Sequence, residues 1–122
     1  MGFAVVNYNY RLAPENKFPS SVEDTNSVFN WIEKNQNEYG FDCNNVFAVG
    51  DSAGANLLAL YAAILTNAEL KKKYDFELPS EINLKAVALN CGKYTVRNFG
   101  CSEQKAPVAE AHRGVVSMNS AI

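Results

Sequence analysis

A glycine-rich turn that carries a serine lies between two apolar segments near the middle of the chain. The turn consists of Gly50, Asp51, Ser52, Ala53 and Gly54. Residues 45–50, which lead into it, form a short apolar run typical of a buried strand, and residues 55–65 after it contain almost no polar side chain, as in a buried helix. The chain must therefore change from strand to helix within a few residues, with a serine at the centre of the turn.

The pattern G-x-S-x-G between a strand and a helix is typical of a nucleophile elbow. Its strained backbone lifts the Ser52 hydroxyl clear of the sheet, and small residues at Gly50 and Gly54 are needed because neighbouring backbone passes close to the turn. Ala53 lies at the start of the helix, and its N–H is expected to point at the oxyanion that develops during the reaction. The helix dipole would further stabilise the negative charge of this oxyanion. We predict Ser52 as the nucleophile, Ala53 as an oxyanion-hole donor, and Gly50, Asp51 and Gly54 as the remainder of the elbow.

Nucleotide-binding turns between a strand and a helix are also rich in glycine, but this turn differs from them. It has neither the Gly-Lys-Ser/Thr ending of a phosphate loop nor the G-x-G-x-x-G spacing of a dinucleotide site. The pattern therefore favours a reacting serine over bound phosphate.

Strands and helices are predicted to alternate along most of the chain. The segment 3–8 is a buried strand, an amphipathic helix begins at Ser20 and ends at Gly40, and 84–89 is the last strand. The order β-α-β-α-β predicts an α/β fold with a parallel sheet and right-handed crossovers. Residues 105–122 show no convincing periodicity and stay unassigned.

Charge and cysteine content exclude several classes of function. Eleven basic and 13 acidic side chains give a net charge of −2, so no basic field attracts nucleic acid. Cys43, Cys91 and Cys101 are an odd number without CxxC spacing, so they indicate neither a zinc site nor a disulfide framework. No apolar run approaches the roughly 18 residues of a membrane span, and no signal peptide is recognisable. We expect a cytoplasmic protein without metal or organic cofactor.

Two motifs at a characteristic separation resemble one enzyme family. Tyr10-Arg-Leu-Ala-Pro-Glu15 follows the first strand, and Gly50-Asp-Ser-Ala-Gly-Ala-Asn56 follows the second. Together they resemble the hormone-sensitive-lipase-like branch of the α/β-hydrolases, over residues 2 to about 94. The resemblance implies a three-layer α/β/α fold with a mostly parallel sheet, present here as a single incomplete domain over 1–122. It also implies hydrolysis of small carboxylic esters through an acyl-enzyme on Ser52, without a cofactor.

The same resemblance carries expectations about residues outside the elbow. Arg11, Glu15 and Asp24 are expected to stabilise the loop and the next helix by ion pairing. The His-Gly-Gly-Gly segment and the triad acid and base of the family are not recognisable in the sequence, and His112 comes too early to be that base. A family strand that would separate 3–8 from 45–50 is also not recognisable, so the sheet is expected to have a gap or to re-pair. We therefore expect the 122 residues alone to be inactive.

Three alternatives stay open at the level of the sequence. The elbow does not distinguish an esterase from an amidase, a thioesterase or a peptidase on the same fold. The same branch includes a hormone receptor that lacks the triad histidine, so a non-catalytic ligand-binding module is possible. The third alternative is a non-functional fragment.

Overall fold

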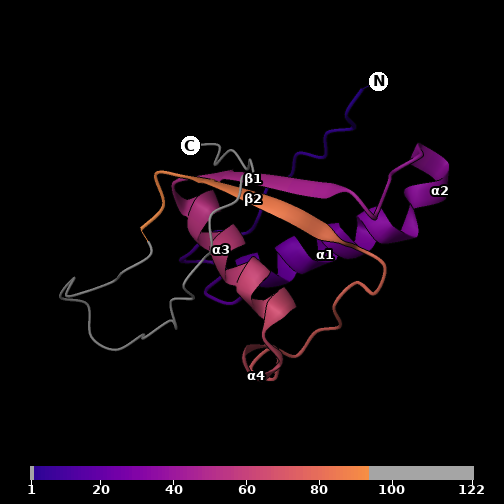
Figure 1. The fold of residues 1–122 in the computed structure, drawn as a ribbon. Coiled ribbons are helices and arrows are strands. Elements are labelled where there is room, and N and C mark those ends of the chain that lie inside the picture. Colours follow the sequence, from indigo (N-terminus) through magenta and orange to yellow (C-terminus); the bar gives the residue numbers. More distant parts are fainter. Residues whose placement is uncertain (1, 94–122) are drawn as a thin grey trace.

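The computed structural model describes residues 2–93 of the 122-residue chain. Figure 1 shows two adjacent strands with two longer helices below them in the view. The elements are, in chain order, α1 (Ser20–Lys34), α2 (Gln36–Tyr39), β1 (Val46–Asp51), α3 (Ala53–Thr66), α4 (Ala68–Lys71) and β2 (Leu84–Asn90). The predicted α/β class is confirmed, and β1, α3 and β2 form its central unit.

The two strands pair in parallel, as predicted from the alternation of strands and helices. Their register places Gly50 opposite Leu89 and Asp51 opposite Asn90, so that both strands end at the same level. Parallel strands need a crossover connection, and α3 provides it here. The carboxyl ends of both strands thus lie at one edge of the sheet, where α3 begins (Figure 1).

Helix α3 packs against both strands and against α1. Tyr61, Leu58 and Ile64 are among its fully buried side chains, and the ring of Tyr61 lies 4.8 Å from that of Phe29 on α1, centroid to centroid. Burying one such aliphatic side chain stabilises the fold by about 1.5–3 kcal/mol. The predicted buried helix is confirmed on these faces, but Leu60 and other side chains on the remaining surface are only half-buried.

The helix predicted from Ser20 to Gly40 is interrupted in the structure, so the prediction of one continuous helix was wrong. α1 ends at Lys34, and α2 follows after Asn35. The Asn35 side-chain amide donates to the Trp31 carbonyl over 2.7 Å, and asparagine commonly competes with helical backbone in this way. Gly40 ends α2 with a left-handed backbone at φ 68°, in the predicted role.

The segment Phe3–Tyr8 is not a strand in the structure, which corrects the prediction from its composition. A strand is defined by hydrogen bonds to a neighbour, and within residues 2–93 the sheet contains only β1 and β2. Phe3 and Val5 are 91% and 85% exposed instead of buried. The apolar pattern indicated a strand but not its partner. Of the two expected outcomes, a gap in the sheet or re-pairing, no pairing of this segment with β1 is seen within residues 2–93.

One helical layer is visible on the sheet within the described residues. α3 lies on both strands and α1 lies on α3, whereas Phe47 on β1 is 54% exposed. The second helical layer of the three-layer expectation is not among the elements between residues 2 and 93. Over the same range, no helix is both long enough and apolar enough to cross a bilayer.

Candidate active site

Ser52 is the single residue that joins β1 to α3. Its φ of 51° and ψ of −113° lie in a region that non-glycine residues rarely adopt. Such strain persists only where the surrounding structure holds it, and it is common at catalytic turns. Ser52 is exposed, and its side chain makes no capping hydrogen bond to α3, so the first turn of the helix does not sequester the hydroxyl.

Gly50 is required by the close approach of the first turn of α3. A Cβ at this position would lie 2.6 Å from the carbonyl carbon and oxygen of Gly54 and 2.7 Å from the nitrogen of Ala55. All three atoms belong to the backbone, so no side-chain rotation could relieve the clash. The geometric reason predicted for a small residue at position 50 is therefore present.

Two backbone hydrogen bonds hold the turn from both sides. The Ser52 N–H donates to the Asn90 carbonyl at the end of β2 over 2.9 Å, and the Asn56 N–H donates to the Ser52 carbonyl over 3.2 Å. The first bond links the elbow to the neighbouring strand, and the second links it to α3. The strained conformation of Ser52 is thus supported by both elements that it adjoins.

Ala53 is the first residue of α3, which is 14 residues long. The N–H groups of the first helical turn have no intrahelical carbonyl to bind, and the aligned peptide dipoles make this end of the helix positive. Ala53 is exposed, as is the neighbouring Ser52. The turn therefore presents the Ser52 hydroxyl and the positive end of a helix side by side at the surface, and such an end stabilises a nearby negative charge.

The remainder of a catalytic triad is not found among residues 2–93. The chain's single histidine, His112, lies outside the described residues. No group of His, Cys, Asp and Glu within the described part of the chain could hold a metal ion. A hollow between the C-terminal half of α3 and β2 does not include residues 50–54 in its walls.

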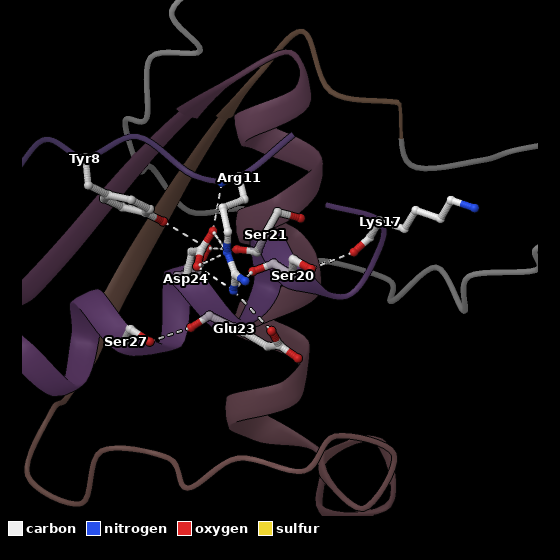
Figure 2. Close-up of polar contacts among 9 residues, drawn as sticks. Tyr8, Arg11, Lys17, Ser20, Ser21, Glu23, Asp24 and Ser27 are labelled. Carbon is white, nitrogen blue, oxygen red and sulfur yellow. Dashed lines mark hydrogen bonds and ion pairs between the residues drawn. The ribbon is translucent and has the colours of Figure 1, made fainter. Parts of the chain in front are cut away.

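Arg11 and Asp24 form the predicted ion pair, which Figure 2 shows beside the start of α1. An Arg11 guanidinium nitrogen lies 2.8 Å from an Asp24 carboxylate oxygen, and a second contact of 3.2 Å reaches Glu23. The Arg11 N–H also donates to Asp24 over 2.8 Å. Partial burial raises the pKa of Asp24, but the hydrogen bonds and charge of Arg11 outweigh it, so the pKa is lowered. Glu15 is exposed and forms no ion pair with any residue in the range 2–93.

Tyr8 attaches the N-terminal segment to the same helix. Its hydroxyl donates to Thr25 over 3.0 Å, and the Thr25 hydroxyl donates to the Ser21 carbonyl over 2.9 Å (Figure 2). Burial raises the pKa of Tyr8 to about 12, so the phenol stays a donor at neutral pH. These contacts position the loop and α1, and none of them involves Ser52.

Sequence reasoning missed Asn90 and Cys91 as neighbours of the elbow. Asn90 acts through its backbone carbonyl, and any residue type could supply that group. Cys91 has a φ of 54°, and a positive φ cannot be predicted from the presence of a cysteine. Only the parallel register of β1 and β2 brings these residues to Ser52.

Comparison with known proteins assigns the sequence to a family. The family model BD-FAE matches residues 1–119. The chain belongs to the BD-FAE family of α/β-hydrolases. The predicted α/β-hydrolase resemblance is thereby confirmed.

Individual relatives carry esterase names. The chain is 38% identical over 60 residues to carboxylesterase NlhH of Mycobacterium tuberculosis, which is 49% of this chain and 19% of that protein. It is 39% identical over 67 residues to an arylesterase of Saccharolobus solfataricus, covering 55% of this chain and 22% of the relative. It is 37% identical to arylacetamide deacetylase of Bos taurus, with 62% of this chain and 23% of the relative covered. The chain spans about a fifth of the length of these relatives.

Proposed function

We propose that the protein hydrolyses small carboxylic esters and that Ser52 is its nucleophile. The observation that carries the proposal is the strained φ of 51° at Ser52, directly before the first helical N–H of α3. A serine held in this way projects from the end of a strand toward solvent, where a carbonyl carbon can approach it.

The reaction proceeds in two halves. The Ser52 oxygen attacks the ester carbonyl while a general base takes its proton, and the carbonyl oxygen becomes an oxyanion near the Ala53 N–H. Collapse of the tetrahedral intermediate expels the alcohol, which receives the proton, and leaves the acyl group on Ser52. Water then attacks the acyl-enzyme and releases the acid. Residues 2–93 contain no histidine to serve as the base, so that role is unassigned.

Support for an ester substrate comes from the relatives. Two of them are named carboxylesterase and arylesterase, and each matches about half of this chain as part of a larger protein. Family membership supports an ester hydrolase, and the geometry of Ser52 supports a covalent mechanism.

A second candidate, amide hydrolysis, is favoured by the name that two relatives share. The protein from Bos taurus is named arylacetamide deacetylase, and that name refers to an amide substrate. Parallel assays with an aryl acetate and the corresponding aryl acetamide would separate the two substrates. We expect kcat/KM to be higher for the ester.

The proposal is tested by covalent labelling in the intact protein. A fluorophosphonate should modify Ser52, identified by peptide mass spectrometry, and Ser52→Ala should abolish both the label and the hydrolysis of p-nitrophenyl acetate. Ser27→Ala is the matched control, because Ser27 is an exposed serine whose hydroxyl donates to the Glu23 carbonyl within α1. Labelling at another residue, or full hydrolysis by Ser52→Ala, would overturn the proposal. Ester binding without turnover would support the receptor-like alternative.

A further inference from the structure

Two non-glycine residues in the described part of the chain have a positive φ. They are Ser52, at 51°, and Cys91, at 54°. Left-handed backbone is unfavourable for residues with a Cβ because the Cβ crowds the following carbonyl oxygen. Each of the two residues directly follows the last residue of a strand, since β1 ends at Asp51 and β2 ends at Asn90. The residue that follows each strand therefore has a similar, positive φ.

A single hydrogen bond connects the two strained positions. Asp51 and Asn90 are partners in the strand register, and the Ser52 N–H donates to the Asn90 carbonyl over 2.9 Å. The donor belongs to the peptide unit that precedes Ser52, and the acceptor belongs to the unit that precedes Cys91. A peptide unit is planar, so the direction of its carbonyl relative to the following chain is set by the φ of the next residue.

We propose that Cys91 is a positioning residue for the nucleophile. Its left-handed backbone directs the Asn90 carbonyl at the Ser52 N–H, and this bond holds Ser52 in its strained conformation. Suppose that the backbone of Cys91 became extended while the chain after it stayed in place. The peptide unit between Asn90 and Cys91 would then rotate, and the Asn90 carbonyl would no longer point at the Ser52 N–H. The inference rests on the proposed function only where it concerns reactivity, because the backbone link itself is independent of chemistry.

The role belongs to the backbone of Cys91 and not to its thiol. The side chain is exposed and forms no disulfide with another cysteine in the range 2–93. A series of substitutions at position 91 therefore distinguishes the effect of the backbone conformation from the effect of the thiol. Glycine adopts a positive φ without cost, alanine has a Cβ but no thiol, and valine is β-branched and strongly disfavours this region.

Amide hydrogen exchange tests the backbone link directly. In the intact protein, Cys91→Val should accelerate exchange of the Ser52 amide by about tenfold or more, whereas Cys91→Ala and Cys91→Gly should stay within about threefold of the wild type. The Leu58 amide, inside α3, reports the stability of the helix in the same samples. Lys85→Val is the matched control, because Lys85 is an exposed residue within β2, where a β-branched side chain is well tolerated. Equal acceleration at Ser52 and Leu58, or none at Ser52, would overturn the inference.

Fluorophosphonate labelling tests the consequence for the nucleophile. The labelling rate of Ser52, per mole of folded protein, should fall about tenfold or more in Cys91→Val and stay near the wild-type rate in Cys91→Ala and Cys91→Gly. A large loss in Cys91→Ala would assign the role to the thiol and overturn the inference. Selective loss of Ser52 protection in Cys91→Val, in a protein whose wild-type Ser52 is never labelled, would support the backbone link and refute the proposed function.

Discussion

Gly50 and Gly2 differ in what a methyl group would contact, and this difference yields a direct test of the elbow. An added Cβ at Gly50 meets three backbone atoms at 2.6–2.7 Å, whereas nothing lies within 4 Å of one at Gly2. Gly50→Ala should lower the free energy of unfolding by about 1–3 kcal/mol and reduce Ser52 labelling about tenfold or more, because the turn must shift. Gly2→Ala should change neither. Urea unfolding and labelling rates check this, and full labelling in Gly50→Ala would contradict it.

The ion pair between Arg11 and Asp24 predicts a pH-dependent contribution to stability. The pKa of Asp24 is lowered in the folded state, so its contribution is complete above the ordinary aspartate pKa of about 3.9 and is lost as the pH falls through the folded value. Asp24→Asn should therefore be less stable than the wild type at pH 7, and the deficit should shrink below about pH 4. Asp75→Asn is the control, because Asp75 is exposed and makes no ion pair within residues 2–93. Urea unfolding at pH 7 and below about pH 4 measures how much less stable Asp24→Asn is than the wild type. An equal loss of stability under both conditions would refute the prediction.

At the scale of helices and strands, a buried asparagine joins three segments. The Asn26 side chain on α1 accepts a hydrogen bond from the Tyr61 hydroxyl on α3 over 2.9 Å, and its amide donates over 2.9 Å to the Glu77 carbonyl in the segment before β2. Tyr61 is fully buried and Asn26 is 5% exposed, so water cannot replace a lost partner without rearrangement. This contact fixes α3 against α1 and against the segment that leads into β2.

Tyr61→Phe removes one donor from this contact and leaves the Asn26 oxygen buried without it. We expect the free energy of unfolding to fall by about 1–3 kcal/mol, measured by urea titration. Tyr39→Phe is the control, because Tyr39 is 55% exposed and its ring lies against Trp31 and Phe41 at the surface. A loss of equal size in both variants would show that the buried hydrogen bond contributes nothing specific.

At the scale of the whole molecule, several large apolar side chains lie at the surface of residues 2–93. Phe3 and Phe47 are 91% and 54% exposed, and Phe47 lies on β1. Exposed aromatic groups of this kind favour self-association. Phe47→Thr should therefore reduce the concentration dependence of the size-exclusion profile of the 122-residue chain without lowering its melting temperature, because threonine is well suited to strands. An unchanged profile would show that this side chain does not drive association.

The local features of this protein can be predicted from its amino-acid sequence. The positions of β1, α3 and β2 follow from apolar periodicity, and the need for glycine at position 50 follows from the tight turn around Ser52. These features depend on sterics and spacing within about a dozen neighbouring residues, which is the range that a sequence pattern reports. The motif after residue 9 also indicated the family, and the resemblance implied ion pairing by Arg11, Glu15 and Asp24, of which the structure shows Arg11 and Asp24 paired.

The contacts between distant segments could be learned only from the folded chain. The composition of Phe3–Tyr8 predicted a strand, but pairing requires a neighbouring strand, and none of the described elements occupies that place. The hydrogen bond from Ser52 to Asn90 depends on the register of two strands, and the strain at Cys91 depends on how the chain leaves the second one. Backbone carbonyls and N–H groups are common to almost every residue type, so their partners leave no trace in the sequence and are set by the arrangement of the folded chain.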